Sequence, residues 1–455
     1  MKRLIYSKAI FASLLFFILL SSCKKENGTS EVRPAQTSAV KEYGHLKQTK
    51  TYSSEVAQKW QDLQLQVLWV PAGSPNPYGL NGNRWFAYIG IALYEAVVPG
   101  MPAYQSLYSQ LIDMPEMPST EPGKAYHWPT SANAALAFLN KSFYTNINFR
   151  PAMDALEQSL NDQYQSEISA DEFQRSQNFG REVARRIFEW SKTDGALTVY
   201  PTYVPPTGVG IWSPTAPNPT AIASPYWGNN RLFVQGSLDN TSSSPPPPYS
   251  TDPSSAYYKM VKEVYDVSQS LTAEQRAAGL YFNDIPGYQA GTHYLSAFNQ
   301  VMHNENPTLD FYALAHAKVG ISLASSQIGC WQIKYNLLVE RPIRYIRNVL
   351  GHSTWTPLIP THPHPEFPSG HSQTGGAFAA AMTNVFGQDY HFTLHTYDNQ
   401  GMAPRPYNTF FEMAEDIGRS RVYGGIHYSY TCTESLKQGS KIVDNILNKL
   451  KFKKD

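Results

Sequence analysis

The chain has 455 residues, of which 16% are charged and 42% are apolar or aromatic, and its formal net charge is +1. This length suffices for a large hydrophobic core, and the near-neutral charge excludes a nucleic acid or an acidic polymer as the expected partner. The 33 prolines and 30 tyrosines are typical of a globular protein with long, irregular connections.

The N-terminal segment has the pattern of an export signal. Basic residues precede an apolar stretch, residues 10–20, that is too short to span a bilayer, and the following Leu-Ser-Ser-Cys resembles a bacterial lipobox. We therefore expect residues 1–23 to be a lipoprotein signal peptide and Cys23 to be lipidated, which would anchor an exported protein to a bacterial membrane by lipid alone. An ordinary signal peptide or membrane anchor is the alternative. Residues 24–50 are polar and are expected to form a flexible tether.

Helical spacing of apolar residues dominates the remainder, residues 51–455, and neither strand-like alternation of useful length nor an internal repeat is present. The fold class is therefore expected to be mainly α, a helical-bundle body with two packed helical halves. Predicted helices cover residues 83–98 (apolar nearly all round), 130–146 (N-cap Thr130 or Ser131), 169–192 (capping box Ser169 and Glu172), 256–271, 272–284, 292–303, 310–340, 374–387 and 433–451.

A proline-rich stretch divides the helical body. Residues 200–254 contain too many prolines for regular elements and are expected to run over the surface, held by tryptophan and tyrosine side chains. The predicted halves are thus residues 51–255 and residues 256–455. The motifs that suggest chemistry all lie in the second half.

The first motif is "KYNLLVERP", with Lys334 and Arg341 seven residues apart. This spacing is close to two helical turns, so both side chains are expected to project from one helix face. Pro342 disfavours the helical conformation of the residue before it, so the helix is expected to end at Arg341. A solvated pair of surface cations is the alternative.

The second motif is "HPHPEFPSGHSQTGG", residues 362–376. Pro368 suits a first helical turn, and Gly370 lets the backbone approach a ligand closely. The Ser369 hydroxyl and the free N–H groups of the helix start can bind an anion, with His371 beside them as an acid or base. A helix cap without a ligand is the alternative.

The third motif is "GRSRVYGGIHYSYT", in which Arg421 and His427 are six residues apart. Six residues do not share a face of a straight helix, so the intervening glycines must bend the chain if the two side chains converge. Together, the three motifs predict a cage for a tetrahedral oxyanion. Cations neutralise it, N–H groups and a serine hold its oxygens, one histidine handles protons and the other bonds the central atom.

The patterns Lys-x6-Arg-Pro, Pro-Ser-Gly-His and Ser-Arg-x5-His resemble the three signature motifs of vanadium-dependent haloperoxidases and type-2 phosphatidic acid phosphatases. The resemblance implies that His427 bonds vanadium or phosphorus and that His371 is the acid–base. In the phosphatase alternative, His427 would form a phospho-histidine. The implied oxyanion-binding residues are Lys334, Arg341, Ser369, Gly370 and Arg421.

Three features favour the haloperoxidase branch. The helical half before the motifs is long, residues 83–98 resemble an early haloperoxidase helix, and "TAEQRAAGLYFNDIPG" resembles a segment that supplies a buried acid. Asp284 matches that acid and would pair with Arg421. This branch implies vanadate as cofactor and halide, hydrogen peroxide and small organic acceptors as partners, with vanadate acting as a Lewis acid. A lipoprotein that captures phosphate without turnover is a further alternative.

Three positions bear on the halide and on the orientation of the vanadium ligand. Trp331 resembles a tryptophan of fungal chloroperoxidases, whereas His364 matches a histidine of bromoperoxidases. Thr431 stands where many members have aspartate, four residues after the last histidine. Because iodide is most easily oxidised, we expect iodide to react first, bromide second and chloride little.

The remaining histidines and cysteines leave two questions open. His362 and His364 suggest a metal pair, but no acid or cysteine nearby in the sequence completes a ligand set. Cys330 and Cys432 are too few for a disulfide framework. An exported protein could pair them, and two buried thiols are the alternative.

Overall fold

The computed structural model describes residues 47–454 except residues 75–76, 216–220, 285 and 290. The expected signal peptide and nearly all of the expected tether lie outside these residues. The last tether residues, 47–50, belong to the folded body. Thr49 is buried, and its hydroxyl donates to the carbonyl of Val97 at 2.8 Å. The body therefore includes residues that were expected to belong to the tether.

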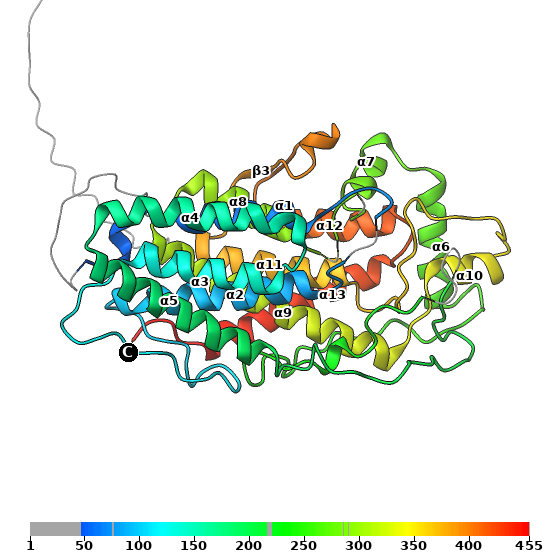
Figure 1. Ribbon diagram of the computed structural model, residues 1–455. Coiled ribbons are helices and arrows are strands. Elements are labelled where there is room, and N and C mark those ends of the chain that lie inside the picture. Colours follow the sequence, from blue (N-terminus) through cyan, green and yellow to red (C-terminus); the bar gives the residue numbers. More distant parts are fainter. Residues whose placement is uncertain (1–46, 75–76, 216–220, 285, 290, 455) are drawn as a thin grey trace, which may run out of the picture.

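Within the described residues the protein has thirteen α-helices and two very small sheets, which confirms the mainly α fold class (Figure 1). None of these helices has the length and hydrophobicity needed to cross a bilayer. The helices are α1 Glu55–Leu68, α2 Asn81–Val97, α3 Trp128–Phe143, α4 Arg150–Glu167, α5 Ala170–Ser191, α6 Ala256–Gln269, α7 Ala273–Tyr281, α8 His293–Glu305, α9 Leu309–Leu337, α10 Pro342–Asn348, α11 Gly370–Phe386, α12 Phe410–Tyr423 and α13 Ser429–Lys449. The antiparallel strand pairs are β1 Trp69–Val70 with β2 Gly287–Tyr288, and β3 Phe392–Leu394 with β4 Arg405–Tyr407.

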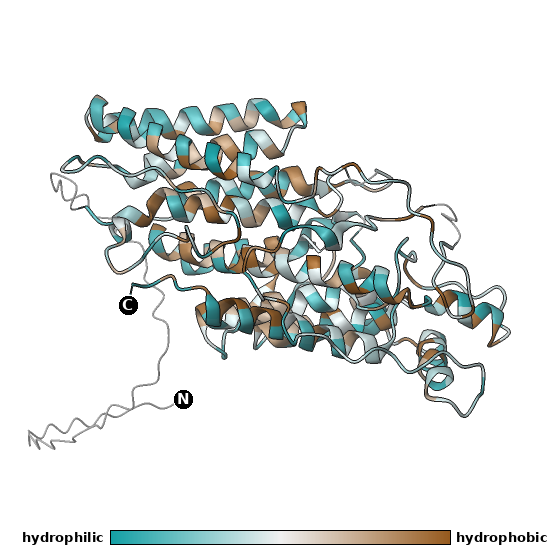
Figure 2. Cartoon of the chain, turned by 90° about the horizontal axis from the view of Figure 1, so that it is seen from below, coloured by the Kyte–Doolittle hydropathy of each residue, from teal (hydrophilic) through white to brown (hydrophobic). Residues whose placement is uncertain are grey.

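The long helices lie side by side along the long axis of the molecule, and one large core joins both halves of the chain (Figure 1). Helix α2 is buried nearly all round, as expected, and packs along α9. Gly90 of α2 and Gly320 of α9 lie so close to the partner backbone that a Cβ atom would overlap it. Figure 2 shows hydrophobic and hydrophilic residues alternating around the outer helices, typical of amphipathic helices that cover a core.

The predicted start of α5 agrees with the structure, whereas the predicted start of α3 does not. Ser169 caps α5, because its hydroxyl accepts from the N–H of Glu172, which is the serine half of the expected capping box. The expected N-cap of α3 is wrong: this helix begins at Trp128, before Thr130 and Ser131. Pro129 occupies the first turn, where the missing N–H costs nothing, so the helix extends to a residue that carries no capping hydroxyl.

The proline-rich stretch follows an irregular path, as expected. Its described residues contain a single short 3-10 helix, Trp227–Asn229. Trp212 is buried, and its backbone N–H donates to the carbonyl of Leu338 at 2.7 Å. Tyr200 and Tyr226 stack with ring centroids 4.4 Å apart. The rings of Tyr203 and Trp212 pack edge-on against Tyr335 of α9, with ring centroids 5.2 and 6.2 Å apart. Aromatic side chains thus hold this stretch against the end of α9, next to the first motif.

Helix α11 lies at the centre of the second half and contacts α9, α12 and α13. Its close approach to α13 depends on Gly376 and Gly439, where a Cβ atom would overlap the backbone of the other helix. Small residues at a helix crossing allow such short interaxial distances. This packing brings the first turn of α11 beside the segment that joins α12 to α13.

Candidate active site

The three motifs converge at one end of α11. Lys334 comes from the last turn of α9, Arg421 from the last turn of α12, and His427 from the bend before α13. With Arg341 and the start of α11 they form a buried group. A cavity of about 330 Å³ lies against it and is lined by residues that include Asp284, Trp331, His364, Gly370, His371, Arg421 and His427.

The expected shared helix face of Lys334 and Arg341 is wrong. Helix α9 ends at Leu337, and Leu338 adopts a left-handed conformation with φ 50°. Arg341 is extended, with φ −76° and ψ 148°, and serves as the N-cap of α10, whose first residue is Pro342. Both cations are nevertheless fully buried, which also excludes the solvated surface pair.

The Lys334 ammonium lies beneath the loop that leads into α11. Its Nζ donates to the carbonyls of Pro365 at 2.8 Å and Glu366 at 3.1 Å, and also to that of Pro368. Burial, together with the nearby Arg341 charge, lowers the pKa of Lys334 to about 7. An anion beside this group would offset both effects.

The start of α11 is built as a capped helix end. The helix begins at Gly370, and the Ser369 hydroxyl accepts from the N–H of Ser372 at 3.3 Å. Pro368 lies before the helix and not in its first turn as expected. The first N–H groups of a helix have no intrahelical partner, so this end attracts negative charge. The capping interpretation of Ser369 is thus correct and is compatible with anion binding.

His371 is paired with Asp284. The Nε2 atom of His371 lies 2.8 Å from Oδ1 of Asp284, and burial together with Arg421 lowers the pKa of this histidine. Burial alone would raise the pKa of Asp284, but His371, His362 and Arg421 hold it well below its usual value. Both members of the pair line the cavity.

The expected ion pair between Asp284 and Arg421 is not present among the described residues. Arg421 donates from Nη1 to the carbonyl of Phe282, two residues before Asp284, and its charge reaches the carboxylate through space. Its Nε atom is buried without a partner in the described part of the chain. An unpaired guanidinium N–H in a buried cavity wall is a ready donor to an anion.

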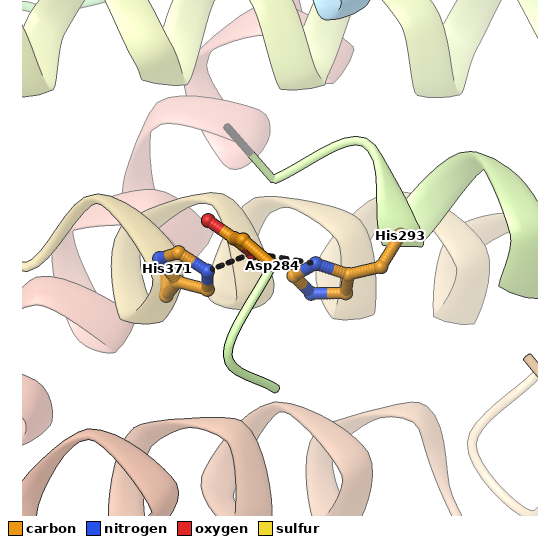
Figure 3. Close-up of side chains that lie close together, drawn as sticks. All are labelled: Asp284, His293 and His371. Carbon is orange, nitrogen blue, oxygen red and sulfur yellow. Dashed lines mark hydrogen bonds and ion pairs between the residues drawn. The ribbon is translucent and has the colours of Figure 1, made fainter. Parts of the chain in front are cut away.

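Asp284, His293 and His371 also form a group of side chains of the kind that binds metal ions (Figure 3). Their ligand atoms lie within 4.8 Å of one another. Nε2 of His362 also lies 3.8 Å from Oδ2 of Asp284. The histidine pair of the second motif therefore has an acid near it in the folded protein, although none is near it in the sequence. The charge of Arg421 acts on this cluster, and it disfavours a divalent cation there.

His427 has a carboxylate partner that the three motifs did not predict. Its Nδ1 lies 2.8 Å from Oε1 of Glu366, and Thr431 donates to Oε2 of the same carboxylate at 2.9 Å. Burial raises the pKa of Glu366 to about 7, opposed by Arg341 and Lys334. The sequence signal was the lone acid inside "HPHPEFPSGH", combined with the missing acid at position 431.

Trp331 and His364 form one wall of the cavity together. Their ring centroids are 5.2 Å apart, and Nδ1 of His364 lies 3.1 Å from Nη2 of Arg341. The indole N–H of Trp331 is buried without a partner in the part of the chain that the structure describes. The ring of Trp331 also lies 3.3 Å from the position of a Cβ at Gly370, so this glycine lets the first turn of α11 approach the wall.

Cys330 and Cys432 are both free and buried, so the two-thiol alternative is correct. Burial raises the pKa of Cys330 to about 11 and that of Cys432 to about 12. Such thiols remain protonated and unreactive near neutral pH.

The residues present fit a tetrahedral oxyanion such as vanadate or phosphate. Lys334, Arg341 and Arg421 supply three cations, and burial lowers the pKa of each. A buried guanidinium N–H without a partner and the N-terminus of α11 add donors. A bound anion would stabilise the charged forms of these cations. Asp284 contacts His371, and Glu366 contacts His427.

Comparisons with known proteins relate the chain to haloperoxidases of known structure. Residues 315–453 match the family model of the VCPO second helical-bundle domain. A bacterial vanadium-dependent iodoperoxidase of known structure is 28% identical, with a TM-score of 0.78 over 89% of this chain and 98% of that chain. Holo and apo structures of bacterial vanadium-dependent chloroperoxidase are 18% and 17% identical, with TM-scores of 0.63 and 0.60. They cover 86% and 81% of this chain and 92% and 94% of those chains. No match was found among curated proteins.

The matched segment contains all three motifs, whereas Asp284 lies before it. The likeness to the iodoperoxidase extends over nearly the whole of that protein and includes the N-terminal helices. The chain therefore contains a segment similar to the VCPO second helical-bundle domain, and its likeness to the bacterial vanadium-dependent iodoperoxidase, an enzyme, extends over 89% of its length.

Proposed function

We propose that the protein is a vanadate-dependent haloperoxidase that uses hydrogen peroxide to oxidise iodide, and bromide less readily, to hypohalous acid. The observation that carries the proposal is the buried convergence of Lys334, Arg341, Arg421 and His427 at the N-terminus of α11, beside the Asp284–His371 pair. The 28% identity to a bacterial iodoperoxidase over 98% of that chain supports the choice of reaction.

The side chains of the site have different proposed roles, which follow from their charge and position. Lys334, Arg341 and Arg421 neutralise the oxyanion, while the Ser369 hydroxyl and the first N–H groups of α11 hold its oxygens. His427 would bind vanadium through Nε2. When bound, vanadate supplies a Lewis acid that activates peroxide without a change in its own oxidation state.

Proton transfer falls to the remaining pair. Oxidation of a halide by peroxide to hypohalous acid and water consumes a proton, so the site needs a group that can deliver one. His371 lines the cavity. Its Nε2 lies 2.8 Å from Oδ1 of Asp284, whose negative charge favours the protonated form of the histidine. General acid–base help of this kind contributes about a hundredfold or more to a rate.

The proposed halide order follows from how strongly peroxide must be polarised. Iodide gives up electrons most easily and chloride least. His364 stands beside Trp331 in the cavity wall, and burial keeps its pKa well below the usual value, so it adds no positive charge there. We therefore expect iodide to be oxidised first, bromide second and chloride little, with released hypohalous acid reacting with small organic acceptors.

An acid phosphatase remains the second candidate, because the same cage would hold a phosphoryl group. Nε2 of His427 faces Arg341 and would be the nucleophile that forms a phospho-histidine, with His371 protonating the leaving group. This alternative requires no vanadate. It therefore predicts a different response to the same additions.

The deciding experiment assays the purified protein with vanadate, peroxide and each halide separately. Bromide and chloride oxidation are followed by bleaching of monochlorodimedone, and iodide oxidation by triiodide formation. A parallel assay follows phosphomonoester hydrolysis without vanadate. Vanadate-dependent iodide oxidation supports the proposal. Inactivity with all three halides alongside brisk phosphomonoester hydrolysis would assign the protein to the phosphatases, and robust chlorination would contradict the halide order.

We also propose that the protein is exported and anchored to a bacterial membrane through a lipid on Cys23. The support is the basic, apolar and lipobox pattern of residues 1–23. The described body includes residues from 47 onward, so the polar residues after Cys23 would connect it to the lipid.

A further inference from the structure

We propose that Glu366 is a positioning residue that fixes the hydrogen of His427 on Nδ1 and so leaves the Nε2 lone pair free for the bound oxyanion. The inference rests on the proposed role of His427 as the residue that bonds the central atom. It assigns to the loop before α11 a carboxylate that the family pattern places at position 431, where this chain has threonine.

The first line of evidence is on the Nδ1 side of the ring. Oε1 of Glu366 lies 2.8 Å from Nδ1 of His427 and also accepts from the backbone N–H of Tyr428 at 3.2 Å. A carboxylate oxygen that accepts from a backbone N–H offers an acceptor to the ring as well. The ring nitrogen that faces Glu366 is therefore the one that carries hydrogen.

The second line of evidence is on the Nε2 side and is independent of the first. Nη1 of Arg341 lies 3.0 Å from Nε2 of His427. A guanidinium has donors and no acceptor, so Nε2 must be the accepting, hydrogen-free nitrogen. The two contacts select the same tautomer. If an oxyanion occupied the cage, Arg341 would donate to its oxygens, and the Nε2 lone pair would be free to bond the central atom.

The carboxylate itself is firmly held. Glu366 is fully buried, its backbone N–H donates to the carbonyl of Val339 at 2.9 Å, and its Oε2 accepts from the Thr431 hydroxyl at 2.9 Å. Three donors from the start of α13 and the preceding bend thus converge on one acid. Partners of this kind orient a metal-binding histidine, and their loss typically weakens metal binding 10- to 100-fold.

Thr431 shows why the acid could move along the chain. It lies four residues after His427, in the first turn of α13, and its hydroxyl reaches the same carboxylate that holds the histidine. An aspartate at this position would extend toward the space that the Glu366 carboxylate now fills. The two positions are therefore interchangeable sources of one negative group, and this gives a rescue experiment.

The first measurement is vanadate binding to the purified full chain by calorimetry. Glu366→Ala is expected to weaken vanadate binding by about 100-fold, and the double variant Glu366→Ala/Thr431→Asp to recover at least about tenfold of that loss. Thr431→Ala is the matched control, because it removes one hydroxyl from Oε2 and leaves the contact of Oε1 with His427. Its expected loss is below about tenfold. Affinity of Glu366→Ala within about twofold of wild type would overturn the assignment.

The second measurement is the tautomer of His427 without any ligand, by ¹⁵N NMR of protein labelled at histidine, with His427→Asn as the assignment reference. Wild type and Thr431→Ala are expected to show hydrogen on Nδ1 alone. Glu366→Ala is expected to lose this preference, and Glu366→Ala/Thr431→Asp to regain it. An unchanged Nδ1–H signal in folded Glu366→Ala would show that Glu366 does not position the ring.

A further variant separates positioning from folding. In Glu366→Gln the amide oxygen can keep both contacts of Oε1, and the amide N–H₂ can donate to Thr431, so the variant should fold and retain the tautomer. Loss of the Nδ1 tautomer in Glu366→Gln with intact unfolding temperature would contradict the geometric argument. If wild type fails to bind vanadate, the proposed function is wrong, while the NMR comparison still decides the role of Glu366.

Discussion

Oδ1 of Asp284 lies 2.8 Å from Nε2 of His371, although the two residues are 87 positions apart in the chain. Asp284 stands just after α7 with φ 72°, a left-handed conformation that aspartate tolerates better than most residues. Its carboxylate contacts His371, the proposed acid–base residue, and makes no ion pair with Arg421 in the described part of the chain. The pair therefore acts as one unit at the cavity wall.

This unit predicts a non-additive pair of substitutions. His371→Ala should leave vanadate bound but slow halide oxidation by about a hundredfold, and Asp284→Asn should also reduce the rate because it removes the charge that favours protonated His371. The double variant should be no slower than His371→Ala, since both changes act through one imidazole. Initial rates at saturating vanadate provide the check, and multiplied losses in the double variant would contradict the pairing.

His427→Ala should abolish halide oxidation even at excess vanadate. The substitution removes the only side chain proposed to bond the metal, whereas the three cations can still attract the free anion to the cage. The measurement is the triiodide rate across a vanadate titration, with His371→Ala as the comparison that keeps the metal ligand. Rates like those of wild type would remove the proposed mechanism entirely.

Cys23→Ala should release the protein from membranes or block its maturation. The thiol of Cys23 is the expected site of lipid attachment. Fractionation of cells that express the variant, with blotting of membrane and soluble fractions, tests this. Full membrane retention of a normally processed variant counts against the lipid anchor.

Gly439→Ala should lower the free energy of unfolding by about 1–3 kcal/mol, as overpacking in a core does. A Cβ atom there would overlap the carbonyl of Gln373, and backbone atoms cannot rotate aside. Gly418→Ala is the matched control, because its Cβ would meet only side-chain atoms at 3.5 and 3.6 Å. Chemical denaturation of both variants provides the measurement, and equal stabilities would show that α11 and α13 can separate without cost.

Glu95 should make stability depend on pH. Burial raises its pKa from 4.5 to about 7, against hydrogen bonds from the N–H of Leu107 and the hydroxyl of Ser106. The folded state then binds a proton more tightly than the unfolded state. The stabilising contribution is complete below pH 4.5 and is lost as the pH rises through about 7, by roughly 3 kcal/mol in total. Glu95→Gln should flatten this decline in denaturation experiments between pH 5 and 8. An identical pH profile in the variant would exclude Glu95 as its source.

Sequence alone determined the features that depend on neighbouring residues. The apolar periodicity gave α2, the serine before an acidic first turn gave the start of α5, and the prolines of residues 200–254 excluded regular elements there. The three motifs identified residues that the structure brings together, because each motif depends on residue types at short, fixed spacing. Local patterns are readable because the forces that produce them act within one or two helical turns.

Only the tertiary structure decided which of these residues touch. Arg341 does not belong to the helix of Lys334, because a new helix starts at Pro342. Both cations nevertheless bind the loop before α11 and so lie at the same site. Glu366 was recognisable as a partner of His427 only when the bend before α13 lay against that loop. The distance between a carboxylate and an imidazole is fixed by how helices distant in sequence pack together. That packing depends on the whole core, and no spacing within one motif records it.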